Sequence, residues 1–196
     1  GELVPLTSTF DPDHPVPTIG GPLVGMVEFT GEESVEVPEF LDQWAMVGKN
    51  LGEVVPAGGF HQKELPGLIG ASEPYPLLCD RPDVLTFETA PLDVDTEVTG
   101  WVEVVLVVSS NAPDTDFTAK LVDVYPPNDD YPDGYHLNLT DTILRMRYRD
   151  GWDHEVTMKP GEVYEVTLRL WPTSNLFKKG HRIRLDISSS NFPRFD

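Results

Sequence analysis

The chain has 196 residues and a formal net charge of −19, with 33 acidic side chains against 14 Lys and Arg. Nucleic acids and anionic membranes both require a basic patch, so this charge argues against either partner. No apolar stretch approaches the ~20 residues of a transmembrane helix, and we expect a soluble chain. The length suits one domain, and the lone Cys79 excludes an intrachain disulfide. No targeting signal fixes the compartment, although the cytoplasm is slightly favoured.

Residues 1–80 have little regular patterning and are predicted to form a connector and docking segment. Three prolines within residues 11–17 hold the chain extended. Residues 38–52 contain one short helix candidate, in which Phe40, Leu41, Trp44 and Val47 recur at helical spacing. Residues 52–80 return to glycine and proline, and so long an irregular excursion is usually functional or packed on a partner.

From Arg81 onward the pattern changes to the period of two that predicts half-buried strands, most clearly at residues 164–170 and 182–187. Further strands are predicted at residues 84–88, 98–108, 117–124 and 143–148, separated by turn clusters. Short strands without alternating helices predict an antiparallel β-sandwich. The apolar sides of the two clearest strands should point into one core: Val166, Leu168, Leu170, Ile183, Leu185 and Ile187.

A search for catalytic residues finds no complete site. The closest approach to a hydrolase nucleophile elbow, Gly70-Ala71-Ser72-Glu73-Pro74, lacks the second glycine that permits the sharp turn. Cys79 has no histidine near it in sequence, which favours an inert thiol. An enzyme acting through Cys79 or His61 remains an alternative, because the fold can bring a base to a nucleophile.

Metal and cofactor sites are not predicted either. The five histidines are scattered, so no zinc motif is present. The acidic run at residues 128–134 suggests calcium, but an EF-hand loop beginning at Asp129 would place Tyr131 and Thr140 at ligand positions, which favours a solvated turn. The four tryptophans leave open a sugar-stacking platform: Trp44, Trp101, Trp152 and Trp171.

Residues 81–196 resemble the C-terminal domain shared by cocaine esterase-like hydrolases and X-prolyl dipeptidyl peptidases. Residues 11–21 are similar to the segment by which these proteins leave their α/β-hydrolase domain. The motifs that carry the resemblance are Arg81-Pro82-Asp83-Val84-Leu85, Ala112-Pro113-Asp114-Thr115-Asp116-Phe117-Thr118-Ala119-Lys120-Leu121, Leu170-Trp171-Pro172-Thr173-Ser174, Lys179-Gly180-His181-Arg182-Ile183-Arg184 and Ser188-Ser189-Ser190-Asn191-Phe192-Pro193-Arg194-Phe195-Asp196.

The resemblance implies an all-β, jelly-roll (galactose-binding-like) β-sandwich at 81–196, preceded by the connector at 1–80. It implies an accessory role for the chain: packing on the α/β-hydrolase domain of the same parent chain and shaping the entrance to an active site that acts on acyl esters or X-Pro peptides. The family's Ser-Asp-His triad belongs to that other domain, and no residue here matches it. The rival function is a free-standing carbohydrate-binding jelly roll.

The chain departs from the family pattern in two places. Residues 22–80 are longer than the usual connector, and residues 58–64 stand where many relatives have a short Asp-Gln-Arg stretch. The chain also stops at Asp196, where the family normally continues, so the sandwich is expected to lack closing strands. A homo-oligomer is left open. The candidate domain-interface residues are Trp44, Phe60, His61 and Gln62.

Overall fold

The computed structural model describes residues 5–19, 59–68, 70–192 and 194–195, and within them the regular secondary structure is β-strand apart from two short 3₁₀ turns. All strand pairs are antiparallel, in a four-stranded sheet of order β1-β6-β3-β4 and a two-stranded sheet β2-β5. The predicted antiparallel β-sandwich is therefore confirmed. The strands are β1 (Leu85–Glu88), β2 (Thr96–Val108), β3 (Asp116–Tyr125), β4 (Tyr135–Arg145), β5 (Tyr164–Phe177) and β6 (Arg182–Ser188), with 3₁₀ turns η1 (Leu78–Asp80) and η2 (Met146–Tyr148).

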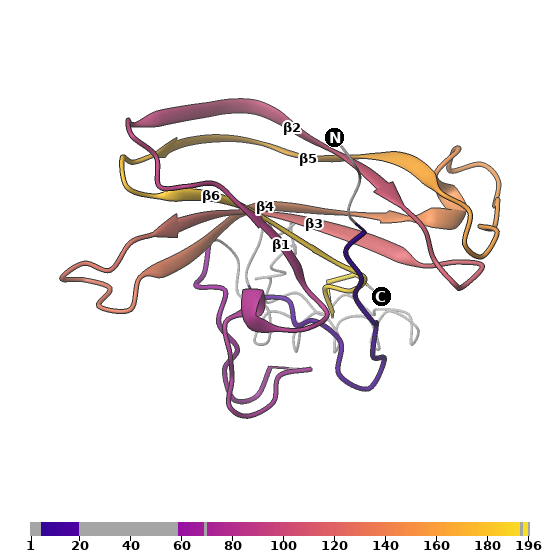
Figure 1. Ribbon diagram of the computed structural model, residues 1–196, viewed down its shortest axis with the longest axis horizontal. Coiled ribbons are helices and arrows are strands. Elements are labelled where there is room, and N and C mark those ends of the chain that lie inside the picture. The colour runs from indigo at the N-terminus through magenta and orange to yellow at the C-terminus, as the bar shows by residue number, and fades with distance from the viewer. Residues whose placement is uncertain (1–4, 20–58, 69, 193, 196) are drawn as a thin grey trace, which may run out of the picture.

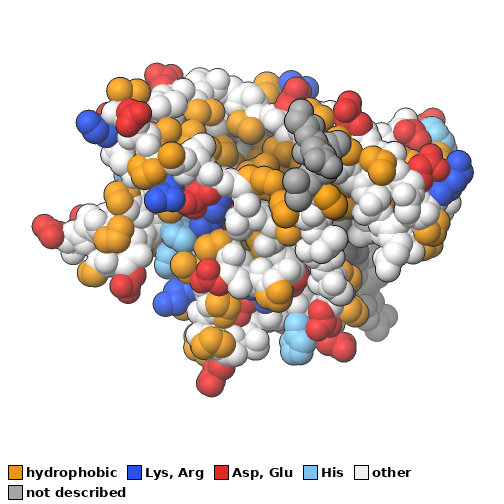
Figure 2. Space-filling model, viewed as in Figure 1, with side chains coloured by type: hydrophobic (Ala, Val, Ile, Leu, Met, Phe, Trp, Pro, Cys, Tyr) orange, Lys and Arg blue, Asp and Glu red, His pale blue; other side chains and the backbone are white. Residues whose placement is uncertain are grey.

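Three layers are visible in the molecule (Figure 1). The β2-β5 sheet lies on one side of the four-stranded sheet, and residues 5–19, 59–68 and 70–84 lie on the other. In the space-filling view, hydrophobic surface gathers in a band between the two sheets (Figure 2). No helix among the described residues is long and apolar enough to cross a membrane.

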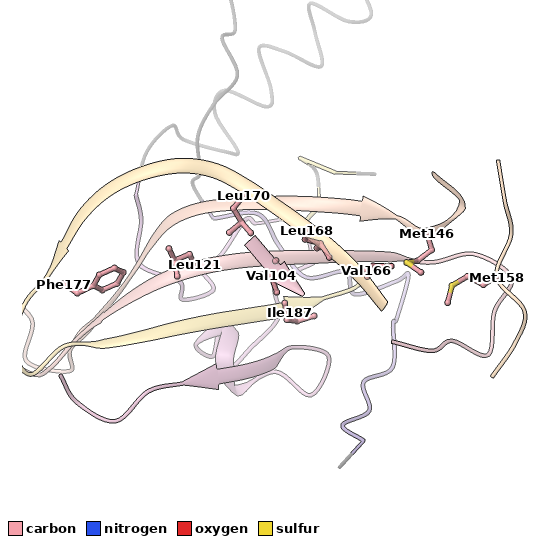
Figure 3. Packing of buried hydrophobic residues seen from close by; sticks show 10 residues of the cluster. Val104, Leu121, Met146, Met158, Val166, Leu168, Leu170, Phe177 and Ile187 are labelled. Carbon is pink, nitrogen blue, oxygen red and sulfur yellow. The ribbon is translucent and has the colours of Figure 1, made fainter. Parts of the chain in front are cut away.

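The main core lies between the two sheets (Figure 3). It is built from the inward sides of the strands, and Leu168, Leu170 and Phe177 of β5 are almost completely buried. Ile187 belongs to the same cluster, while Ile183 and Leu185 pack against it from β6. The predicted inward register of β5 and β6 is thus confirmed.

The second face of β6 differs from the expectation of a half-buried strand. Arg184 and Asp186 alternate with the core residues and point away from the β2-β5 sheet, yet both side chains are also buried. The central strand β3 is likewise buried on both sides. The physical reason is the third layer: residues 59–68 and 70–84 cover the outer face of the four-stranded sheet and exclude water from polar side chains that alternation assigns to solvent.

Two predicted boundaries were wrong. The strand expected at 143–148 is β4, which runs from Tyr135 to Arg145 and is followed by the η2 turn. The apolar–polar alternation of β4 is hard to recognise in the sequence, because the polar residues Asn138 and Asp141 on its outer face are buried rather than solvated. Strand β5 also continues to Phe177, beyond residue 170. The helix predicted within 38–52 lies outside the described residues.

The extension of β5 passes through Pro172, which a strand accommodates only where no ladder hydrogen bond is needed. The pairing of β2 with β5 shifts between Gly100 and Val102, so that Trp101 stands opposite both Trp171 and Pro172. This is a β-bulge, with the proline in the strand that carries the extra residue. The bulge brings the two indoles together on the outer face of the β2-β5 sheet, where their rings stack.

Replacing Leu170 by alanine is expected to lower the free energy of unfolding by about 2–5 kcal/mol, because the side chain is fully buried in the main core. The matched control is Val105→Ala on the opposite face of the same sheet, where the side chain is 61% exposed and the change should stay within about 0.5 kcal/mol. Urea unfolding followed by fluorescence measures both. Equal losses for the two variants would contradict the assigned register.

Candidate domain interface

Residues 59–68 and 70–84, here called the covering segment, are fastened to the outer face of the four-stranded sheet through the backbone of Gln62. Its N–H donates to the carbonyl of His136 at 2.8 Å, and its carbonyl accepts from Leu78 at 2.9 Å. Isolated bridges pair His61 with Leu137 and Lys63 with Leu77. The segment therefore pairs briefly with β4, and much of its backbone is hydrogen-bonded within this chain.

The Gln62 side chain is completely buried and connects three parts of the chain. Its amide nitrogen donates to the carbonyls of Ile19 and Phe60, at 2.8 and 2.9 Å. Its amide oxygen accepts from the ammonium group of Lys120 at 3.1 Å. Since every polar atom of this side chain is used inside the chain, Gln62 positions the covering segment and presents no group to a neighbouring domain.

Lys120 lies at the centre of a row of charged residues across the sheet. The strand register places Asp186 of β6 on one side of it and Asp141 of β4 on the other. Its ammonium also donates to the Asn191 side chain, at 3.4 Å. Burial lowers the pKa of Lys120, while burial raises the pKa of both aspartates and the nearby cations oppose that rise.

Both aspartates have a second cation that helps to hold their charge. Arg184 meets Asp186 through two hydrogen bonds of 2.8 and 3.1 Å, and Arg194 lies 3.0 Å from Asp141. Such pairing is what allows ionised groups to remain away from water. The layer beneath the covering segment is therefore a polar core that orders residues distant in sequence.

Arg81 fastens the far end of the covering segment. Its guanidinium contacts the carboxylates of Glu64 and Asp83 and donates to the backbone carbonyl of His14, at 2.8 Å. Burial opposes the charged form of Arg81, but the hydrogen bonds that its guanidinium donates to Asp83 and Glu64 outweigh burial and raise its pKa. Beneath it is a small second core, which consists of Val16, Ile19, Leu78 and Val84 with Phe60 and Leu68 packed against them.

His61 belongs to an aromatic cluster where the β3–β4 hairpin leaves the sheet. Its ring stacks on Tyr135 with centroids 4.7 Å apart, and its Nδ1 accepts the backbone N–H of His136 at 2.9 Å. Tyr131 packs on Tyr135 at 4.5 Å and is 40% exposed. Burial lowers the pKa of His61, so the ring is neutral at pH 7. This end of the molecule presents uncharged aromatic rings.

The fold brings the Cys79 thiol to the His136 imidazole, and their Sγ and Nδ1 atoms lie 3.9 Å apart. Burial raises the pKa of the Cys79 thiol, whereas an activated cysteine has a lowered one. Burial and the Arg184 charge lower the pKa of His136 to about 4. Both groups are therefore held neutral, and the pair lacks the ion-pair character of a catalytic dyad.

Of the four predicted interface residues, the structure brings three together. Phe60, His61 and Gln62 follow one another along the covering segment, with Phe60 and His61 half-buried and Gln62 enclosed; Trp44 lies outside the described residues. The interface role of these positions stays a prediction. Among the described residues, no group of three or more His, Cys, Asp or Glu side chains is placed to hold a metal ion.

Sequence reasoning missed the polar core itself. Lys120, Asp141 and Arg184 stand on strands whose alternation assigns them to solvent. The one signal in the sequence was that three strands each carry charged residues. These residues can be matched as opposite charges on neighbouring strands only when the strand register is known.

Comparison with known proteins identifies relatives of the whole sandwich. The profile of the X-Pro dipeptidyl-peptidase C-terminal non-catalytic domain matches residues 36–196. Cocaine esterase of Rhodococcus sp. (strain MB1 Bresler) is 50% identical over 117 residues, which are 60% of this chain and 19% of the esterase. The chain therefore spans about one fifth of the length of that relative.

Two solved structures share the fold at 34% identity and a TM-score of 0.56. One is an aminopeptidase from the marine sediment archaeon Thaumarchaeota archaeon, with 58% of this chain and 19% of that chain covered. The other is an α-amino acid ester hydrolase, with 59% and 19% covered. Both resemble this chain over a minor part of their own length.

The contribution of His136 to stability is expected to fall as the pH decreases from about 6.5 to 4, because this side chain has a pKa of about 4 in the folded chain and near 6.5 when unfolded. In this window the unfolded state binds the extra proton, so protonation favours unfolding. His136→Gln should remove about 1–3 kcal/mol of that fall.

The free energy of unfolding is measured by urea unfolding at several pH values, and its slope against pH is compared between the wild type and His136→Gln. His154→Gln on the surface is the control. An unchanged slope in His136→Gln, or an equal change in the control, would show that the buried imidazole is not responsible.

Proposed function

Because the chain belongs to the family of X-Pro dipeptidyl-peptidase C-terminal non-catalytic domains, we propose that it is the accessory domain of a serine hydrolase. In this role it packs on an α/β-hydrolase domain of the same parent chain and shapes the entrance to the active site. The match over residues 36–196 is the observation that carries the proposal. The relatives are an esterase, an ester hydrolase and an aminopeptidase, which supports a parent acting on acyl esters or peptides.

The aromatic cluster around His61 is the surface that best suits this docking. Tyr131 and the half-buried Tyr135 and His61 form adjoining uncharged rings, and aromatic residues are enriched at the centres of interfaces. Prolines in the same hairpin restrict its backbone, so little conformational entropy is lost on docking: Pro126, Pro127 and Pro132. The polar core beneath Gln62 holds the cluster in place.

The purified 196-residue chain is expected to hydrolyse neither a nitrophenyl ester nor Gly-Pro-nitroanilide above the buffer rate. The reason is that its described residues hold no activated nucleophile, and the Cys79–His136 pair is neutral. A spectrophotometric assay measures this. Turnover that disappears in Cys79→Ala but persists in Trp152→Ala would instead establish an independent cysteine enzyme.

The docking role is tested in the parent protein, expressed from the reading frame that contains this chain. His61→Ala and Tyr131→Ser should raise KM for a bulky ester or X-Pro substrate roughly tenfold, the order expected when about 1.4 kcal/mol of binding is lost, and change kcat little. Trp152→Ala, an exposed aromatic away from this cluster, is the control. If the variants lower the melting temperature but leave KM unchanged, the cluster docks on the hydrolase domain but does not shape the active-site entrance. If neither KM nor the melting temperature changes, both roles are rejected.

A further inference from the structure

The outer face of the β2-β5 sheet carries an exposed pair of indoles on the side opposite the covering segment. Trp101 and Trp171 are 55% and 51% exposed, and their ring centroids lie 6.4 Å apart at an interplanar angle of 29°. The guanidinium of Arg169 lies 4.3 Å from the centroid of the Trp101 ring. Among the described residues Trp171 stacks on Trp101 alone, whereas the Trp101 ring also carries the Arg169 guanidinium.

Polar side chains border the indoles at both ends. On one side the hydroxyls of Thr99 and Ser174 lie 3.1 Å apart, and Thr99 donates to Glu97 at 2.9 Å. On the other side Glu103 faces Arg169, with Oε1 and Nε 3.6 Å apart. We call these residues, with the two indoles, the tryptophan strip: Glu97, Thr99, Trp101, Glu103, Arg169, Trp171 and Ser174.

The strip is built on a rigid support. Its residues alternate along β2 and β5 with core residues such as Leu168 and Leu170, so the sheet beneath it is locked by the main core. The carbonyl of Trp171 also accepts a hydrogen bond from the Thr140 hydroxyl of β4, at 3.1 Å. Preorganised aromatic rings lose little entropy when a ligand settles on them.

The chemistry of the strip fits a pyranose ring better than other ligands. One face of a sugar ring presents C–H groups that pack on an indole, and its rim presents hydroxyls that both donate and accept hydrogen bonds. Carboxylates accept, a guanidinium donates, and the Thr and Ser hydroxyls do either. The strip therefore offers an apolar surface between two polar borders, matching an apolar ring face with a polar rim.

Charge disfavours two other ligand classes. Arg169 is the strip's one cation and already faces Glu103, while Glu97 adds a second carboxylate, so phosphates and nucleic acids are repelled. A cationic ligand would compete with Arg169, which covers the Trp101 ring. We propose that the tryptophan strip binds a neutral polysaccharide through its pyranose rings, a function independent of docking on a hydrolase domain.

Affinity electrophoresis in native gels containing hydroxyethylcellulose, soluble xylan or laminarin tests the proposal with the chain as it is. At least one of these neutral polysaccharides should retard the wild-type chain. Trp171→Ala should weaken the retardation at least tenfold, and Trp101→Ala should weaken it less, because that ring is partly covered by Arg169. Trp152→Ala, which removes an indole that is 76% exposed and stacked on Tyr148, should migrate like the wild type.

Titration with the matching hexasaccharide, followed by tryptophan fluorescence, gives the affinity of each variant, and thermal unfolding confirms that each one folds. Retardation by none of the three polysaccharides, or retardation that survives the Trp101→Ala/Trp171→Ala double variant, overturns the proposal. Sedimentation supplies a further arm: a wild-type dimer that becomes a monomer in Trp171→Ala assigns the strip to self-association and also overturns it.

Discussion

The contacts of the buried Lys120 amino group are the constraint on which the arrangement of the molecule depends. A polar group placed away from water needs hydrogen-bond acceptors and nearby carboxylates, and those partners come from β4, β6, the covering segment and the chain near Asn191. Satisfying this one group therefore requires segments more than fifty residues apart to meet. The result is a sandwich with a second, polar core on the outer side of its larger sheet.

The two cores do different physical work. The apolar core between the sheets supplies the main driving force, since it buries the inward sides of every long strand. The polar core positions the covering segment, because the Gln62 side chain is hydrogen-bonded to the Ile19 carbonyl and to Lys120 of β3. That arrangement fixes His61 and its neighbouring rings at one end of the sandwich, and it places the covering segment on the side of the four-stranded sheet that faces away from β2-β5.

The two candidate binding surfaces lie on different parts of the molecule. The aromatic cluster at the β3–β4 hairpin lies beside the covering segment, whereas the tryptophan strip lies on the opposite sheet. The proposed docking surface and the proposed polysaccharide site therefore do not compete for the same residues. Neither use needs a nucleophile, in keeping with the neutral state of Cys79 and His136.

The sequence alone determined the antiparallel sandwich, its family and the inward register of β5 and β6, because alternation is a local property that each strand carries by itself. Only the tertiary structure decided that Arg184 and Asp186 are buried, that β4 begins at Tyr135, and that Trp101 meets Trp171 across a bulge. Each of these depends on which segment lies against which. Two-sided burial comes from the covering segment, and the indole pair comes from a one-residue shift in pairing, which no local pattern encodes.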